Sequence, residues 1–375
     1  MRILVVNSGS KSVKLRVVGD GDELLGAADL GPPDGGTVDE LATFVAGAGD
    51  IDAVGHRVVH GGSRFTQPTL VTDEVRGELE GLNDLAPLHN PPALAGIDAA
   101  RTLLAGAPSI ACFDTAFHAA LPPASSSYAI PADWVTRWGI RRYGFHGLSC
   151  AWALARASAL LGVGDDAIRV IVCHLGGGAS VTAVADGRSV DTTMGFTPLE
   201  GLVMATRSGD LDPGALLWAL DHGLSRQDAF DDLEHRSGLF GLSGGRTGDM
   251  RELLDARAAG DEAAARAVDA YVHRLRAKIA AMAAATGGAD AVVFTGGVGE
   301  NSPAIRSETC RGLGWMGMAI DEGANNGVEV DTDVSHRGAA IRTLVVRARE
   351  DLEIAGQCRR LLGPGPAVRA GTTEG

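Results

Sequence analysis

Three features are scarce in this chain of 375 residues: long hydrophobic runs, cysteines and positive charge. No apolar run approaches the roughly 18 residues needed to cross a bilayer, and no signal-type segment follows Met1, so we expect a cytoplasmic protein without a membrane anchor. Acidic residues outnumber basic ones by 47 to 33, which gives a net charge of −14. Without a broad basic face, the chain is not expected to bind nucleic acid or acidic membranes.

The five cysteines, an odd number without any CxxC pair, predict neither a disulfide framework nor a zinc site. They are typical of a reducing compartment. Aromatic residues make up only 5% of the chain, whereas 45% of it is hydrophobic. This composition is typical of a soluble α/β protein, and the length allows two domains.

Two hairpins built from small residues stand out instead. The first has the sequence NSGSKSVK at residues 7–14, between two apolar runs. Its tip would offer backbone N–H groups, hydroxyls and an ammonium group to an oxyanion, although this pattern alone fits an ordinary turn equally well. The second runs from a strand at 169–173 through HLGGGAS at 174–180 into another strand. Two such hairpins suggest two related lobes that face one nucleotide.

Polar side chains near glycines and strand ends give the first candidate site residues. Arg57 precedes a Gly-Gly turn, and its planar guanidinium suits a carboxylate or a phosphoryl group, although a surface salt bridge is as consistent with this segment alone. Asp114 follows a buried strand at 109–113 and is either catalytic or a helix cap. His146 lies between two glycines, whose backbone freedom allows a close approach to a ligand.

Two glycine-rich segments follow in the second half of the chain. Residues 241–248 precede Asp249, and GGVG at 296–299 is expected to form a tight turn between a strand at 291–295 and a helix that starts near Pro303. Such a turn lets the backbone pass close to a nucleotide, and the helix N-terminus adds N–H groups and partial positive charge. The remaining periodicity predicts helices at residues 38–46, 93–104, 150–161, 250–258 and 261–285.

Eight segments, in order along the chain, resemble the acetate kinase family, which belongs to the larger group of sugar kinases, actin and Hsp70 chaperones. They lie at residues 7–14, 56–62, 86–91, 113–118, 143–147, 174–180, 197–214 and 295–302. One of them alone would be weak support, but eight in family order cover nearly the whole chain. The longest, TPLEGLVMATRSGDLDPG, contains Arg207, which without the resemblance could simply stabilise its turn.

The resemblance implies a two-lobed, duplicated RNase H-like fold of the actin and sugar-kinase type. In this α/β fold each lobe is built on a β-β-β-α-β-α-β-α core, and the nucleotide binds in the cleft between the lobes. Lobe I, with the phosphate hairpin and the acyl substrate side, is expected at residues 1–115 plus 351–369. Lobe II, which binds the nucleotide, is expected at 116–350, and residues 370–375 form a mobile tail. Family members are usually homodimers, so we expect one here.

The implied reaction is reversible transfer of the ATP γ-phosphoryl group to acetate, giving acetyl phosphate and ADP. By resemblance, Arg57 and Arg207 hold the carboxylate and the transferring group. His146 then donates to the equatorial oxygens in the transition state, and Asp114 orients the network.

Further contacts are carried over from the family residue by residue. Asn7 and Glu350 would hold Mg²⁺, or Mn²⁺ in its place, directly or through water. The substrate side is expected to be lined by Arg57, Val59, Leu88, His89, Phe145 and Pro198. The nucleotide is expected to contact Ser10, Ser12, Lys14, His174, Gly176, Gly177, Gly178, Asp249, Met250, Arg251, Gly297, Val298, Gly299, Glu300 and Asn301.

Three departures from the family pattern bear on these expectations. Lys11 stands where a serine is usual and adds positive charge to the first hairpin. Gly177 replaces an asparagine whose side chain would be near the nucleotide. The C-terminal Thr-Asn-Glu-Glu pattern appears as Ala-Arg-Glu-Asp at residues 348–351, which makes Glu350 the least supported metal ligand.

Other functions stay open at the level of sequence. Propionate or butyrate kinases share these motifs and differ in the acid they prefer. A nucleotide-driven conformational switch, like the actin and chaperone relatives, would hydrolyse ATP slowly and regardless of acetate, but it leaves the Arg57, His146 and Arg207 cluster unexplained. A kinase weakened by Lys11 and Gly177 is a third alternative. The sequence specifies neither the direction of the reaction, nor ATP or pyrophosphate as donor, nor the dimer interface.

Overall fold

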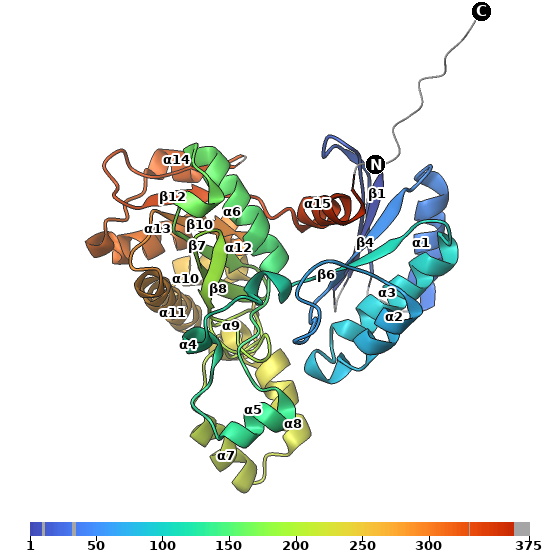
Figure 1. Cartoon of the computed structure of the whole chain (residues 1–375). Coiled ribbons are helices and arrows are strands. Elements are labelled where there is room, and N and C mark those ends of the chain that lie inside the picture. The colour runs from blue at the N-terminus through green and yellow to red at the C-terminus, as the bar shows by residue number, and fades with distance from the viewer. Residues whose placement is uncertain (10–11, 32–34, 330, 364–375) are drawn as a thin grey trace, which may run out of the picture. The chain divides into compact units, whose positions relative to one another are not determined.

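The computed structural model describes residues 1–9, 12–31, 35–329 and 331–363. The chain divides into two compact units. Unit 1 comprises Met1–Ala116 and Arg349–Gly375, and unit 2 comprises Phe117–Ala348. The chain therefore passes from one unit to the other twice. Each unit is an α/β structure with its own six-stranded sheet (Figure 1).

The sheet of unit 1 has the strand order β3-β2-β1-β4-β6-β5. Its strands are β1 (Ile3–Ser8), β2 (Val13–Val18), β3 (Leu24–Leu30), β4 (Ala53–Val58), β5 (Thr69–Leu70) and β6 (Ser109–Phe113). β1 and β2 form an antiparallel hairpin, whereas β4 runs parallel to both β1 and β6. The carboxyl ends of these three parallel strands therefore meet at one edge of the sheet, where open α/β sheets bind ligands.

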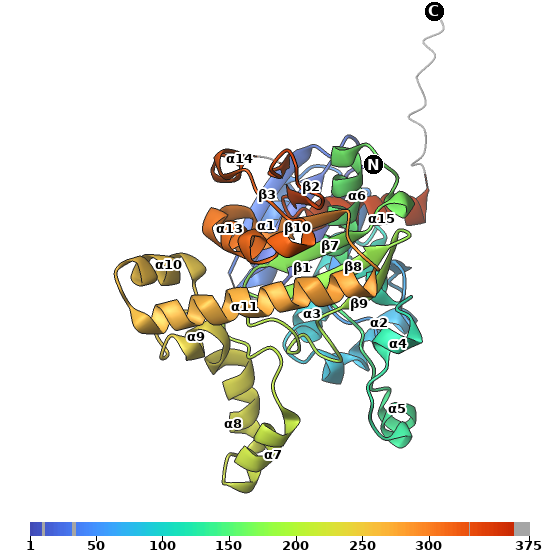
Figure 2. The ribbon, with the colours of Figure 1, turned by 90° about the vertical axis from the view of Figure 1, so that its left-hand side faces the viewer.

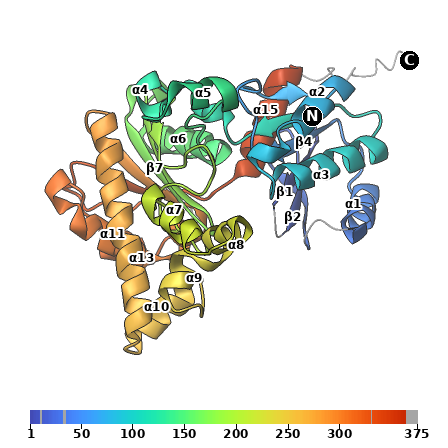
Figure 3. The same cartoon turned by 90° about the horizontal axis from the view of Figure 1, so that it is seen from below.

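Helices cover both faces of this sheet, and α1 and α3 lie beside β1 and β2 in Figure 3. Val6 packs with Leu41 of α1 and Ala100 of α3. The opposite face carries α15, because a Cβ on Gly55 would come within 2.8 Å of Cys358 Sγ. The helical elements are α1 (Gly35–Gly47), α2 (Asp73–Glu80), η1 (Asn83–Leu85), α3 (Asn90–Leu103) and α15 (Glu350–Leu362).

The sheet of unit 2 has the order β11-β12-β10-β7-β8-β9. Read from its other end, β9-β8-β7-β10-β12 repeats the order β3-β2-β1-β4-β6 of unit 1, which confirms the expected duplicated fold. The strands are β7 (Val170–Leu175), β8 (Ala179–Ala185), β9 (Arg188–Thr192), β10 (Ala291–Thr295), β11 (Thr332–Asp333) and β12 (Arg342–Val345).

Two long helices pack on the sheet of unit 2, α6 on β7 and β10 and α11 on β8 and β9. Figure 2 shows α11 extending across the sheet. The helices are α4 (Pro123–Ser126), α5 (Ala132–Trp138), α6 (Gly147–Leu161), α7 (Pro213–Asp221), α8 (Arg226–Asp231), α9 (Gly238–Leu242), α10 (Met250–Ala258), α11 (Glu262–Ala285), α12 (Gly296–Asn301), α13 (Pro303–Gly312) and α14 (Glu322–Asn326). Shorter turns are η2 (Ala116–His118), η3 (Asp165–Ala167), η4 (Asp232–Arg236) and η5 (Gly314–Met316).

Several expected elements have the bounds that the sequence predicts, namely β6, β10 and α10. The expectation of a tight turn at 296–299 is wrong, because these residues begin the helix α12. Gly296 has a φ of +77°, which lets the chain turn sharply off β10. Its N–H donates to Glu300 Oε1 at 3.0 Å, which stabilises the first turn of the helix. Within the described residues, no helix is both long and apolar enough to span a membrane.

Candidate active site

The carboxyl-end edge of the unit 1 sheet gathers three of the predicted residues. Asn7 lies near the end of β1, Arg57 near the end of β4, and Asp114 directly after β6. Arg57 Nη2 donates to Asp114 Oδ2 at 2.5 Å, and Arg57 Nε lies 3.1 Å and 3.2 Å from the two carboxylate oxygens. Asp114 is 0% exposed, so Arg57 and not water compensates its charge.

Burial acts against both charges of this pair. Burial disfavours the charged form of the Arg57 guanidinium. The negative charges of Asp114 and Glu350 outweigh this effect and raise the pKa of Arg57 above its ordinary value. Burial also raises the pKa of Asp114 to about 6, and the attraction of Arg57 limits that rise. At neutral pH both groups are therefore charged.

Glu350, at the start of α15, joins this cluster. Asn7 Nδ2 donates to Glu350 Oε2 at 3.1 Å, and Arg57 Nε lies 3.7 Å from the same oxygen. The two predicted metal ligands are thus neighbours. In the described part of the chain, no group of three or more His, Cys, Asp or Glu side chains could hold a metal ion. A single carboxylate such as Glu350 fits Mg²⁺, which usually keeps several waters and binds one or two carboxylates together with substrate phosphates.

The predicted phosphate hairpin lies beside Asn7. Its turn is closed by the Gly9 N–H, which donates to Ser12 O at 2.8 Å. In the antiparallel register Asn7 is opposite Lys14, whose side chain is exposed, so the two side chains extend from the same face. The predicted contact Ser10 and the departure from the family pattern at Lys11 lie outside the described residues.

The predicted substrate residues of unit 1 follow β4 and precede α3. Val59 is buried, whereas Leu88 and His89 are half-buried. Asn90 holds the backbone of His60, because its Oδ1 accepts from the His60 N–H and its Nδ2 donates to the His60 carbonyl, both at 3.1 Å. Asn90 therefore joins the predicted segments 56–62 and 86–91.

In unit 2, His146 precedes α6 in the left-handed conformation, with a φ of +58°. A non-glycine residue in this conformation is uncommon, and such strain concentrates at functional sites. The His146 ring stacks on His174 with 4.1 Å between centroids, and its Nδ1 lies 3.1 Å from Ser180 Oγ. Ser149 Oγ lies 2.7 Å from His174 Nδ1, which fixes the second ring.

Arg207 approaches His146 at Gly178, in the turn between β7 and β8. A Cβ added to Gly178 would lie 3.5 Å from Arg207 Nη1 and 3.5 Å from His146 Nε2. The two side chains therefore converge on one backbone position, which glycine leaves open. The Ala205 N–H donates to Gly177 O at 3.1 Å and so ties the Arg207 segment to this turn.

The residue that holds Arg207 was missed by the sequence analysis. Glu234 Oε2 accepts from Arg207 Nε at 2.7 Å, and Glu234 is buried. It stands in the run DDLEHR, which resembles an ordinary solvent-exposed segment. An arginine that is shielded from water is expected to pair with a carboxylate, and this expectation is the one signal that the sequence offers. It does not identify which of the 47 acidic residues serves.

The predicted nucleotide turns share one edge of the unit 2 sheet. β7 and β10 run parallel, with His174 opposite Thr295, so the turn after β7 and the start of α12 are neighbours. Asn301 Nδ2 donates to Gly297 O at 2.8 Å within α12. Glu300 Oε1 accepts from the Ala348 N–H at 2.9 Å in addition to the Gly296 N–H. This carboxylate therefore links the first turn of α12 to Ala348, the residue at which the chain leaves unit 2.

The third predicted nucleotide segment starts α10. Asp249 Oδ1 accepts from the Arg251 N–H at 2.8 Å and so caps the helix, and Arg251 Nη2 lies 2.8 Å from Asp249 Oδ2. The Arg251 guanidinium holds the pKa of Asp249 at about 2. Met250 is buried, so its side chain is not open to a ligand.

Two predicted substrate residues also belong to unit 2. Phe145 is fully buried, and its carbonyl accepts from His118 Nε2 at 2.9 Å. Pro198 is half-buried, and its carbonyl accepts from Arg207 Nη1 at 3.4 Å. The expected substrate residues are thus divided between the two units.

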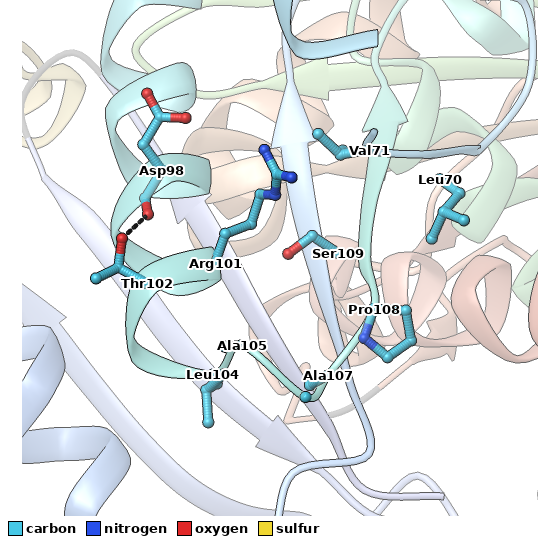
Figure 4. Close-up of a pocket in the computed structure, with 11 residues that line it drawn as sticks. Leu70, Val71, Asp98, Arg101, Thr102, Leu104, Ala105, Ala107, Pro108 and Ser109 are labelled. Atoms are coloured by element: carbon cyan, nitrogen blue, oxygen red, sulfur yellow. Dashed lines mark hydrogen bonds between the residues drawn. The ribbon is translucent and has the colours of Figure 1, made fainter. Parts of the chain in front are cut away.

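Unit 1 also carries an open pocket of about 690 Å³ beside the end of α3 (Figure 4). Asp98, Arg101 and Thr102 line one side, and the Thr102 hydroxyl donates to the Asp98 carbonyl at 2.9 Å. Ser109, which begins β6, lines the pocket, whereas Asp114 follows the end of that strand. The pocket therefore lies at the opposite end of β6 from the Arg57 cluster and is separate from the candidate site.

Comparisons with known proteins identify the family of this chain. The profile of the acetokinase family matches residues 37–356. The acetate kinase of Clavibacter michiganensis is 45% identical over 95% of this chain and 98% of its own length. Among solved structures, the acetate kinase of Porphyromonas gingivalis has a TM-score of 0.89 at 35% identity, covering 96% of this chain and 100% of that one. A propionate kinase from Francisella tularensis has a TM-score of 0.87 at 34% identity, covering 95% and 98%. The chain belongs to the acetokinase family.

Proposed function

We propose that this protein is an acetate kinase, a phosphotransferase with a carboxyl group as acceptor. It transfers the ATP γ-phosphoryl group directly to acetate and gives acetyl phosphate and ADP, reversibly. The observation that carries the proposal is the convergence of Arg207 Nη1 and His146 Nε2, each 3.5 Å from a Cβ position at Gly178. A cation and an imidazole directed at one open position suit a phosphoryl group in transfer.

The reaction needs positive charge to offset its two anionic reactants more than it needs a general base. Acetate has a pKa of about 4 to 5, like the side-chain carboxyls, so it is already ionised at neutral pH. The obstacle is repulsion between two anions, which positioned cations remove. Arg57, with its orientation fixed by Asp114, and Arg207 hold the acetate carboxylate and the phosphoryl group.

His146 supplies a hydrogen bond to the transferring group. When Ser180 donates its hydroxyl proton to His146 Nδ1, the neutral ring carries its own proton on Nε2. That N–H faces the position shared with Arg207 and donates to an equatorial phosphoryl oxygen in the transition state.

The nucleotide and the acid bind to different units in this proposal. Unit 2 is the nucleotide lobe, because the turn after β7 and the first turns of α12 and α10 offer backbone N–H groups. Unit 1 is the acyl lobe and contributes the β1–β2 hairpin with Ser10, Ser12 and Lys14 to the phosphate path.

Mg²⁺ is the ion that we propose for the site, held by Glu350 and, directly or through water, by Asn7. The ion would neutralise part of the charge on the nucleotide phosphates. Asn7 Oδ1 accepts from Arg57 Nη1 at 3.3 Å, which favours a water between the amide and the ion. Mn²⁺ takes similar oxygen ligands and could replace it.

Acetate is favoured over longer acids as substrate. Val59, Leu88, Phe145 and Pro198 are proposed to surround the methyl group. Such an apolar pocket discriminates one methylene by only about 1–3 kcal/mol, so propionate is the second candidate. The 34% identical propionate kinase structure supports keeping that alternative.

We further propose that the protein is a cytoplasmic homodimer. Its cysteines are buried thiols, as expected in a reducing compartment. On α7, Leu217 and Trp218 are each 62% exposed, and Phe230 on α8 is 40% exposed. Figures 1 and 2 draw these two helices extending away from the unit 2 sheet. Exposed large apolar side chains on a projecting helix pair favour an interface between protein chains.

The direct test is acyl-hydroxamate formation with Mg-ATP, hydroxylamine and acetate, propionate or butyrate. We expect the highest kcat/KM with acetate and a loss of at least about a hundredfold in Arg207→Ala, or about 3 kcal/mol of transition-state stabilisation. A higher kcat/KM with propionate would assign the alternative substrate. ATP hydrolysis that is independent of any acid would favour a nucleotide-driven switch and contradict the kinase proposal.

A further inference from the structure

The π-helical turn η4 continues α8 and contains one buried charge. Among its charged residues, Asp232 is half-buried and His235 and Arg236 are exposed, but Glu234 is only 7% exposed. Burying a carboxylate is costly unless it is paired and hydrogen-bonded. π-Helical turns are rare and frequently occur at functional sites. The burial of the Glu234 carboxylate therefore needs an explanation, whereas the other charged residues of the turn are at least partly exposed.

Its partner is the side chain of Arg207. Glu234 Oε2 accepts from Arg207 Nε at 2.7 Å, and both side chains are largely withdrawn from solvent. Because the guanidinium is planar, a fixed bond at Nε also fixes the directions of its other N–H groups. Arg207 Nη1 is the atom that lies near Gly178 and donates to Pro198 O. The carboxylate thus determines where the working end of the arginine points.

The backbone on both sides of Arg207 is attached to the same turn. Thr206 Oγ1 donates to Glu234 O at 2.8 Å, and the Ser208 N–H donates to Leu233 O at 3.3 Å. A Cβ on Gly238, which has a φ of +62°, would lie 2.3 Å from Met204 O, so the two segments pack directly against each other. These contacts hold the segment that contains Arg207 beside the turn that contains Glu234. The ion pair therefore joins two segments that are already aligned.

We propose that Glu234 is a positioning residue for the phosphoryl transfer. It touches neither substrate nor nucleotide, and it holds the Arg207 guanidinium in the orientation that the transition state requires. This inference rests on the proposed role of Arg207. It also makes the two catalytic arginines equivalent, because each is oriented through its Nε by a buried carboxylate, Asp114 for Arg57 and Glu234 for Arg207.

The test compares Glu234→Ala and Glu234→Gln with Asp232→Asn. Asp232 is the matched control, because it is a carboxylate of the same turn that pairs with Arg236 at 2.8 Å. We expect Glu234→Ala to lower kcat at least about thirtyfold with the KM for ATP within about threefold, since the lost interaction acts in the transition state. Glu234→Gln keeps an acceptor oxygen and should recover part of the loss. Asp232→Asn should retain wild-type kinetics.

Whether Glu234 acts through Arg207 is tested by making Glu234→Ala in an Arg207→Lys background. Lysine has no Nε–H for Glu234 to hold, so Glu234→Ala should lower kcat by less than about threefold in that background. A full additional loss there, or a kcat for Glu234→Ala within about threefold of wild type, would overturn the proposal.

A readout without turnover separates this inference from the proposed function. In protein labelled with ¹⁵N-arginine, the Arg207 Nε–H signal, assigned by its disappearance in Arg207→Lys, should exchange slowly with water. It should exchange at least about tenfold faster in Glu234→Ala, because the hydrogen bond that protects it is removed. Equal exchange rates in both proteins would refute the positioning contact even if the wild type phosphorylates acetate. Failure of wild-type turnover would instead refute the proposed function alone.

Discussion

Arg57 and Asp114 form a two-pronged ion pair, in which Arg57 Nη2 lies 2.5 Å from Asp114 Oδ2 and Arg57 Nε reaches both carboxylate oxygens. Asp114 is completely buried, so its replacement by asparagine leaves Arg57 with Glu350 as its remaining carboxylate partner. We expect Asp114→Asn to lower kcat/KM for acetate at least about a hundredfold. Asp98→Asn, which alters an ion pair with Arg76 at the surface, should leave kcat/KM unchanged. Equal effects of the two substitutions would contradict the role of Asp114.

The pH dependence of catalysis should also report on Asp114. Because burial raises its pKa to about 6, protonation below that pH weakens its hold on Arg57, and kcat/KM should fall. Stability should respond with the opposite sign. The folded state binds the proton more tightly than the unfolded state, so the stability cost of this group is present above pH 6 and disappears as the pH falls towards 3.8. Rate profiles from pH 5 to 8 should show an acid limb in the wild type that is absent from the residual activity of Asp114→Asn.

Gly178 should tolerate no side chain without loss of activity. A methyl group there would lie 3.5 Å from both Arg207 Nη1 and His146 Nε2, a distance at which the fold is not strained but the space between the donors is filled. We expect Gly178→Ala to lower kcat at least about tenfold with little change in melting temperature. Gly177→Ala is the comparison, since a Cβ at Gly177 meets nothing within 4 Å. Any effect of that substitution should fall on the KM for ATP.

These residues differ in how far the sequence could predict them. Asn7, Arg57 and Asp114 each stand at or after the end of an apolar strand, and parallel strands bring such positions to one edge. The family motifs in which Asn7, Arg57 and Asp114 stand also mark them as site residues. The sheet order itself follows from tertiary pairing, which no local pattern contains. The sequence pattern nevertheless located β6, β10 and α10 correctly, because each is a regular segment with clear boundaries.

Glu234 and α12 show where local reasoning fails. Glu234 becomes buried only because a π-helical turn packs against a segment 27 residues earlier in the chain. The four residues GGVG have low helix propensity, which favoured a turn at 296–299. Helix α12 forms because Glu300 accepts the Gly296 N–H and Gly299 packs closely on Phe294, a contact that a larger residue would crowd. In both places tertiary contacts outweigh the local preference.

His118 should make the protein sensitive to acid. It is buried, its Nε2 donates to Phe145 O, and burial lowers its pKa to about 4 from the ordinary 6.5. Between these values the unfolded chain binds one more proton, so the stability contribution is complete above pH 6.5 and is lost as the pH falls towards 4. Urea unfolding should show a loss of about 1.4 kcal/mol per pH unit from this group. His118→Gln should flatten that slope, and an unchanged slope would contradict the assignment.

The exposed α7 surface should control assembly. Trp218 is 62% exposed and stacks on His222 with 3.8 Å between ring centroids, so a large apolar side chain lies at the surface of this short helix. Replacing it by glutamate places a charge in the proposed dimer interface, where an unpaired charge costs several kcal/mol once desolvated. Trp315, at 77% exposure in η5, is the control, since its replacement by glutamate adds the same charge away from α7. Sedimentation velocity should give monomers for Trp218→Glu and dimers for both Trp315→Glu and the wild type. If Trp218→Glu sediments as the wild type does, α7 is not the interface, and a wild type that sediments as a monomer would reject the homodimer itself.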